Sequence, residues 1–82
     1  MRLANLTVAK ELTKMPGVYK ITEIVGTSPV SFAEAVKAGV EEAAKTVHHM
    51  SWFEVVEERG HITDGKVAEF QVKLKIGFKI QR

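Results

Sequence analysis

The chain has 82 residues, which fits one small domain with a narrow margin of stability from burial alone. It has no cysteine, so neither a disulfide nor a cysteine-bound metal reinforces the fold. Its formal net charge of +2 is modest and spread along the sequence, which does not favour a nucleic-acid partner. No apolar run approaches the ~18 residues of a membrane span. We therefore expect a cytoplasmic protein that gains stability by self-association.

Residues 1–16 differ in character from the rest of the chain. Their apolar side chains recur at helical spacing, at Leu3, Leu6, Ala9 and Leu12. This spacing predicts an N-terminal extension in the form of a short amphipathic helix or arm, with Met15 as an alternative start. Residues 17–82 are then the folded domain.

Residues 17–47 predict a strand followed by a helix. Residues 17–25 are rich in β-branched and aromatic side chains, and the Gly-Thr-Ser-Pro run at 26–29 indicates a turn after them. Ser31 and Glu34 have the spacing of a capping box, which opens a helix running to about Val47. One stripe of this helix is apolar, at Phe32, Val36, Val40, Ala43 and Val47. Charge pairs four residues apart are expected on its outer side, from Lys37 to Glu41 and from Glu41 to Lys45.

Residues 51–81 predict one long β-hairpin. From residue 68 onward every even position is apolar, at Ala68, Phe70, Val72, Leu74, Ile76, Phe78 and Ile80. Asp64-Gly65 supplies the turn, because both of its central residues adopt positive φ readily. The last strand is long enough that we expect it to curl around the helix, with Gly77 easing the bend.

The register of this hairpin follows if Thr63 pairs with Lys66 and no bulge intervenes. Two pairs then face the helix, Phe53 with Ile76 and Val55 with Leu74. Three pairs face outward, Trp52 with Gly77, Glu54 with Lys75 and Glu58 with Gln71. Trp52 therefore points away from the core, beside a glycine that leaves its flank empty.

The same register places two charged residues, Glu57 and Arg59, on the helix side, where burial without partners is costly. Three resolutions remain open. That side is open to water, Arg59 contacts an anion or another subunit, or a bulge near Gly60 turns the strand.

The predicted order is β-α-β-β, an α+β fold. A helical crossover favours parallel first and second strands. The third strand then lies between them, giving a three-stranded antiparallel sheet of order 1-3-2 wrapped around one helix.

Catalytic chemistry has little support in this sequence. The serines lie at a turn, at a helix cap and before a strand, and no nucleophile elbow, phosphate-binding loop or HExxH motif occurs. His48 and His49 are adjacent and project about 100° apart on a helix, so they suit the helix dipole better than a metal site completed by Glu57 or Glu58. We expect neither an enzyme nor a metal site.

Trp52 admits two interpretations. It is an interface tryptophan of an oligomer, which composition alone favours, or it is a stacking platform for a planar ligand, with Gly77 and Gln71 on the same face. Single-stranded nucleic acid is a weaker alternative, since the lysine row at 73, 75 and 79 accompanies only one exposed aromatic.

Residues 17–82 resemble the dodecins, small flavin-binding proteins. The resemblance is carried by Val18-Tyr19-Lys20, Gly26-Thr27-Ser28, Lys45-Thr46-Val47, Trp52-Phe53-Glu54-Val55, Arg59-Gly60, Phe70-Gln71-Val72 and Gly77-Phe78. It implies assembly as a hollow homododecamer that stores flavins, FMN or riboflavin, in stacked pairs. Trp52 then stacks on the flavin and Gln71 binds its pyrimidine edge, with Gly77 beside the indole and Arg59 and Lys79 as weaker phosphate contacts.

The resemblance has limits and alternatives. Bacterial dodecins often carry arginine where this chain has Lys79, so a bidentate phosphate contact becomes a point charge. The extension at residues 1–16 has no counterpart in the family pattern. A cage that binds coenzyme A or another nucleotide without flavin is the alternative function. Because Gly77 and Gln71 are about 20 Å apart along the strand, we expect Trp52 and Gln71 of one site to come from different subunits.

Overall fold

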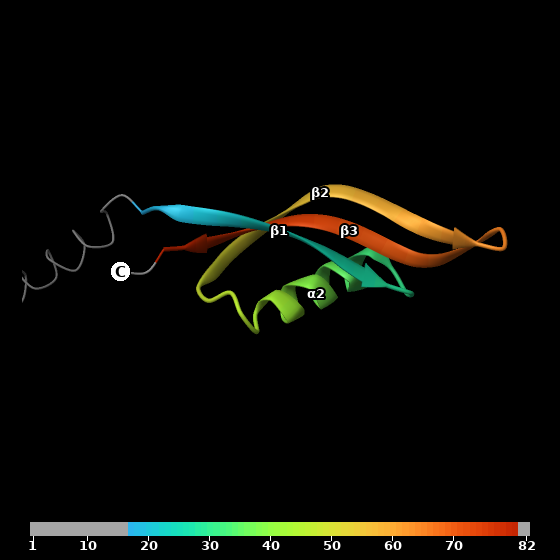
Figure 1. The fold of residues 1–82 in the computed structure, drawn as a ribbon, viewed down its shortest axis with the longest axis horizontal. Coiled ribbons are helices and arrows are strands. Elements are labelled where there is room, and N and C mark those ends of the chain that lie inside the picture. The colour runs from blue at the N-terminus through green and yellow to red at the C-terminus, as the bar shows by residue number, and fades with distance from the viewer. Residues whose placement is uncertain (1–16, 81–82) are drawn as a thin grey trace, which may run out of the picture.

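The computed structural model describes residues 17–80. The elements follow the order β1 (Tyr19–Ser28), α2 (Phe32–Ala43), β2 (Met50–Thr63) and β3 (Lys66–Lys79), as Figure 1 shows. The helix expected within residues 1–16 lies outside the described residues. Among those described, no helix is long and apolar enough to cross a membrane.

The sheet has three strands in the order β1-β3-β2, and both neighbouring pairs are antiparallel. This confirms the predicted β-α-β-β topology. The first strand is longer than predicted, because residues 26–28, expected as a turn, pair with residues 70–72 of β3. A third strand of 14 residues offers this extra length of backbone as a hydrogen-bonding partner.

The helix begins as predicted and ends early. The side chain of Ser31 accepts a hydrogen bond from the backbone N–H of Glu34 at 3.0 Å, which confirms the cap. The last helical residue is Ala43, and not Val47, because residues 44–47 form a tight turn on the carbonyl groups of Glu42 and Ala43. The turn and the positive φ of His49 (62°) bring the chain back to start β2 at Met50.

The helix packs against β1 and β3 (Figure 1). The core between them consists of the buried residues Ala35, Val72 and Leu74. Four partly buried apolar residues pack against this core: Ile24, Phe32, Val36 and Val40. Two glycines allow close approach, since a β carbon on Gly26 would collide with the carbonyl oxygen of Ala35 and one on Gly39 would lie 3.2 Å from the Cα of Gly26. The charge pairs on the outer side join Lys37 to Glu34 and Lys45 to Glu42, three residues apart, in place of the predicted pairs through Glu41.

The register of the hairpin is as predicted beside the turn and from Trp52 to Val55, and it is shifted between these stretches and again at Met50, which pairs with Phe78. Thr63 pairs with Lys66 and Trp52 with Gly77, but Val56 is an extra residue between Val55 and Glu57. The predicted pair of Glu58 with Gln71 is therefore wrong, and Arg59 lies opposite Gln71 instead.

This bulge also resolves the position of the two charged residues that the unbroken register placed on the helix side. Glu57 lies opposite Lys73, and Arg59 lies opposite Gln71, on the outer face of the sheet. The extra residue reverses the alternation of the strand. It also places Glu58 opposite Val72 on the helix side, where Glu58 is exposed because that side of β2 is open to water. A second irregularity between His61 and Ile62 restores the original register at the turn.

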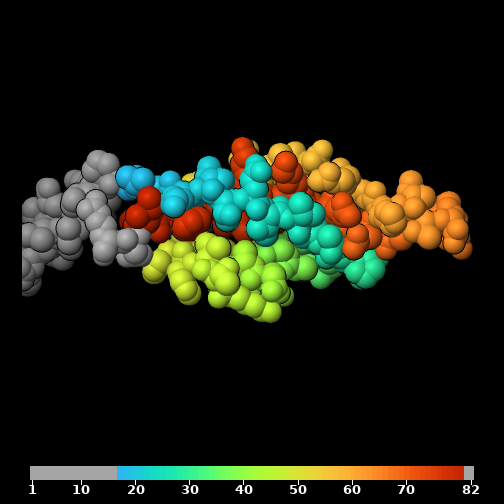
Figure 2. Space-filling view, in the orientation of Figure 1, coloured from blue at the N-terminus to red at the C-terminus, as the bar shows by residue number. Residues whose placement is uncertain are grey.

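The second strand is not covered by the other elements of residues 17–80. Every residue of β2 from Ser51 to Thr63 is exposed, including the apolar Phe53 (51%) and Val55 (42%) on the helix side. The hairpin tip extends past the end of the helix, as Figure 2 shows on the right. The single chain thus leaves an apolar strand surface open.

Candidate functional site

Trp52 lies on the outer face of the sheet, as predicted. Its indole covers Gly77, because a β carbon at position 77 would collide with the six-membered ring. The glycine beneath it is buried, while the indole keeps 42% of its surface exposed. A side chain at position 77 would occupy the space of the indole, so Gly77 determines where the indole lies.

Tyr19 holds the indole from the side. Its ring centroid is 5.1 Å from that of Trp52, and the two planes are tilted by 57°. Tyr19 comes from β1, where it pairs with Lys79, so the two aromatics reach each other across β3. This contact could not be predicted from the sequence, because no turn links β1 to β3 and sets their register.

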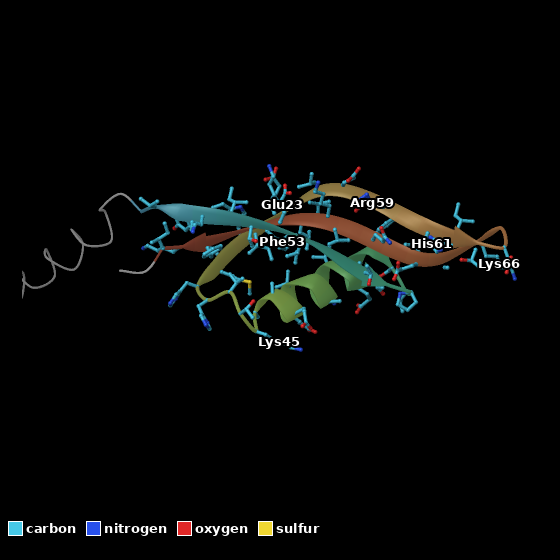
Figure 3. All side chains as sticks on the ribbon, viewed as in Figure 1. Glu23, Lys45, Phe53, Arg59, His61 and Lys66 are labelled. Atoms are coloured by element: carbon cyan, nitrogen blue, oxygen red, sulfur yellow. The ribbon has the colours of Figure 1, made fainter. Side chains whose placement is uncertain are left out.

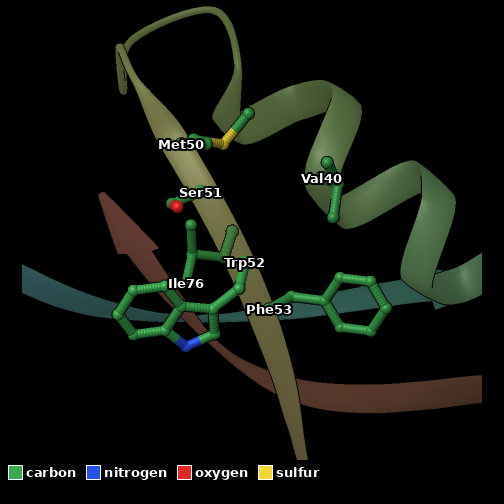
Figure 4. Close-up of a pocket in the computed structure, with 6 residues that line it drawn as sticks. All are labelled: Val40, Met50, Ser51, Trp52, Phe53 and Ile76. Atoms are coloured by element: carbon green, nitrogen blue, oxygen red, sulfur yellow. The ribbon is translucent and has the colours of Figure 1, made fainter. Parts of the chain in front are cut away.

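Two rings of β2 point to opposite sides of the strand, as Figure 4 shows for Trp52 and Phe53. Phe53 points toward the helix, where a hollow of ≈ 220 Å³ is lined by Val40, Met50, Ser51, Trp52, Phe53 and Ile76. This hollow is almost wholly apolar. It continues the uncovered helix-side surface of β2.

The polar candidates gather farther along the outer face. Gln71 stands in one row between Thr27 of β1 and Arg59 of β2. Its Nε2 donates a hydrogen bond to Oε1 of Glu69 at 3.0 Å. Arg59 makes an ion pair with Glu57, with 3.4 Å between Nη2 and Oε1. Figure 3 shows Arg59 on the side of the sheet away from the helix.

The structure therefore brings the predicted site residues together in two groups. Trp52, Gly77 and Lys79 lie at one end of β3, whereas Gln71 and Arg59 lie six or more residues away. Six residues of strand span about 20 Å. The hollow beside Trp52 is not lined by Gln71.

The lysines of the outer face alternate with carboxylates. Lys75 lies between Glu23 and Glu54 in the register, and Lys73 lies opposite Glu57 with its Nζ 3.9 Å from Oε1 of Glu23. Such interleaving cancels the positive field that a phosphate backbone needs.

A second hollow of ≈ 450 Å³ opens beside Lys79. It is lined by Lys20, Thr46, Val47, His48, His49, Phe78, Lys79 and Ile80. Neither Lys20 nor Lys79 pairs with a carboxylate of residues 17–80. The same described part of the chain contains no group of three His, Cys, Asp or Glu side chains placed to hold a metal ion.

Residues 18–81 match the sequence model of the family described as Dodecin. The chain belongs to the dodecin family. A dodecin of Thermus thermophilus is 45% identical over 67 residues, which cover 82% of this chain and 97% of that protein. The solved dodecin of Streptomyces coelicolor has a TM-score of 0.80 and 44% identity, covering 83% of this chain and 97% of its own.

A more distant relative within the family carries a different ligand in its name. The calcium dodecin of Mycobacterium tuberculosis is 30% identical over 64 residues, covering 78% of this chain and 90% of that protein. Its crystal structure, described as having a novel calcium-binding site, has a TM-score of 0.69. Membership of the dodecin family therefore does not by itself name the ligand.

Proposed function

We propose that the protein binds flavins, FMN or riboflavin, in stacked pairs at subunit interfaces and quenches their photochemistry. Its role is storage and protection of flavin, and it catalyses no reaction. The observation that carries the proposal is the half-exposed indole of Trp52, fixed over Gly77 and against Tyr19 on the outer face of a dodecin-family chain.

The indole suits a conjugated ring. Stacking buries apolar area on both partners and adds about 0.5 to 1.5 kcal/mol for each aromatic pair. An indole that is already fixed by its neighbours loses little side-chain freedom when the ligand arrives. A stacked tryptophan also donates an electron to a photoexcited flavin, which quenches its fluorescence, so no acid, base or nucleophile is required.

Self-assembly is part of the proposal. The helix packs mainly on β1 and β3, and Phe53 and Val55 on β2 leave an apolar surface that a second copy can cover. A hollow homododecamer is the assembly expected for this family. Since Trp52 and Gln71 of one chain are about 20 Å apart, a flavin that touches both takes them from different subunits, with Arg59 and Lys79 available to its phosphate.

The test is a flavin titration of the assembled protein. Bound FMN or riboflavin should lose its fluorescence, and Trp52→Ala should restore it. Trp52→Phe is the matched control, because it keeps an aromatic ring for stacking but is a poorer electron donor, so binding should persist with weaker quenching. Flavin that stays fluorescent at micromolar wild-type protein refutes the proposal.

A nucleotide such as coenzyme A, bound without flavin, is the second candidate. The hollow beside Lys79 favours it, since Lys20, Lys79 and two histidines line it together with apolar side chains. Such a lining suits phosphates joined to a less polar group. Mass spectrometry of the ligand released on denaturation separates the two candidates.

A further inference from the structure

Glu69 contacts the amide that the proposed flavin site uses. Glu69 and Gln71 are two residues apart on β3, so their side chains lie on the same face. The Nε2 of Gln71 donates a hydrogen bond to Oε1 of Glu69 at 3.0 Å, and both residues are half-buried. This contact links two side chains that point toward the outer face.

The chemistry of a carboxylate determines which way the amide faces. An ionised carboxylate only accepts hydrogen bonds, whereas the two ends of a glutamine amide differ, one donating and the other accepting. Next to Glu69, the NH₂ group must therefore face the carboxylate. The carbonyl oxygen and the second N–H of Gln71 remain for another partner.

The neighbours of this pair leave the orientation intact. Arg59 lies opposite Gln71 in the register, but its guanidinium pairs with Glu57 at 3.4 Å. His61 lies opposite Glu69. Within residues 17–80, the side-chain hydrogen bond of Gln71 goes to Glu69.

We propose that Glu69 is a positioning residue that orients the Gln71 amide so that its carbonyl oxygen accepts a hydrogen bond from a ring N–H of the ligand. The matching ligand edge is a cyclic lactam or imide, which presents N–H beside C=O. This inference rests on the proposed flavin-binding function and adds the origin of its selectivity. It predicts that the protein rejects a flavin whose N3–H is replaced by N–methyl.

The test compares the affinities of riboflavin and 3-methylriboflavin in four full-length assembled proteins. The wild type should prefer riboflavin by about tenfold or more, because the methylated edge leaves the carbonyl oxygen of Gln71 without its donor. Glu69→Gln can present either its oxygen or its NH₂ group to Gln71, so its preference should lie between those of the wild type and Glu69→Lys. Glu69→Lys offers only donors, so it turns the carbonyl of Gln71 inward and should reduce the preference by roughly two- to tenfold. Glu41→Lys is the matched control, since it makes the same charge change on the exposed side of α2.

The outcomes distinguish this inference from the function on which it rests. A preference that falls in Glu69→Lys and remains in Glu41→Lys supports the role of Glu69. If Glu69→Lys keeps the wild-type preference, or if Glu41→Lys loses it equally, amide orientation is refuted while flavin binding stands. If the wild type binds neither flavin, the proposed function falls and this inference falls with it.

Discussion

Substitution of Gly77 by alanine is the sharpest test of how this glycine positions the Trp52 indole. The new β carbon would occupy the space of the Trp52 ring, so the indole must move off the strand. A little over half of the surface of Trp52 is buried now, since 42% of the residue is exposed. Moving it exposes apolar area and breaks the contact with Tyr19.

The magnitude follows from these contacts. Loss of the aromatic pair costs about 0.5 to 1.5 kcal/mol, and exposing the buried part of the ring costs up to about 3 kcal/mol at ~25 cal/mol per Å². Alanine in place of glycine within a strand recovers about 0.5 to 1 kcal/mol. We therefore expect the free energy of unfolding to fall by roughly 1 to 3 kcal/mol, as for other overpacked sites, and the flavin affinity to fall about tenfold or more.

The assay combines urea denaturation, near-UV circular dichroism of the indole and flavin titration. Gly65→Ala is the matched control, because its φ of 74° makes alanine strained while nothing lies within 4 Å of the added β carbon. It should lower stability and leave flavin affinity at the wild-type value. Wild-type dichroism and wild-type flavin affinity in Gly77→Ala would show that the indole does not depend on this glycine.

Two further substitutions test the neighbours of this site. Tyr19→Ala should weaken flavin binding by roughly two- to tenfold, because the indole loses its lateral contact with the tyrosine ring. Tyr19→Phe keeps the ring and should bind flavin as the wild type does. If a titration shows that Tyr19→Ala also binds as the wild type does, Tyr19 does not position the indole. Phe53→Lys should lower the oligomer mass in analytical ultracentrifugation, because it places a charge in the apolar surface of β2. Lys45→Ala, which removes an exposed side chain paired with Glu42, should not lower it. A Phe53→Lys protein of wild-type mass would mean that subunits do not meet over Phe53.

The hairpin illustrates how far local sequence rules reach. Alternation from residue 68 onward and the Asp64-Gly65 turn correctly predicted that Trp52 lies opposite Gly77. They did not reveal the bulge at Val56, because a single extra residue leaves no mark on the apolar pattern of β3. The charges at Glu57 and Arg59 and the adjacent apolar pair Val55-Val56 were its signals. The structure combines two of the open resolutions, a bulge at Val56 rather than near Gly60 and a helix side that is open to water.

The helix shows the same division. Its cap at Ser31 depends on residues three positions apart, and the prediction there was right. Its end at Ala43 depends on where β2 must begin, which is a constraint from the sheet. The apolar stripe continued to Val47, so the sequence overestimated the length.

The sequence by itself determined the order of elements, the two faces of the hairpin and the outward direction of Trp52, because period-two alternation and turn chemistry act between near neighbours in the chain. Only the tertiary structure decided that Tyr19 touches the indole, that Arg59 stands beside Gln71 and that the helix leaves β2 uncovered. The contact of Tyr19 with Trp52 joins strands far apart in the sequence, and the row of Arg59 and Gln71 depends on the bulge in the hairpin. Their geometry depends on bulges and on close packing at Gly26 and Gly39, which no local pattern encodes.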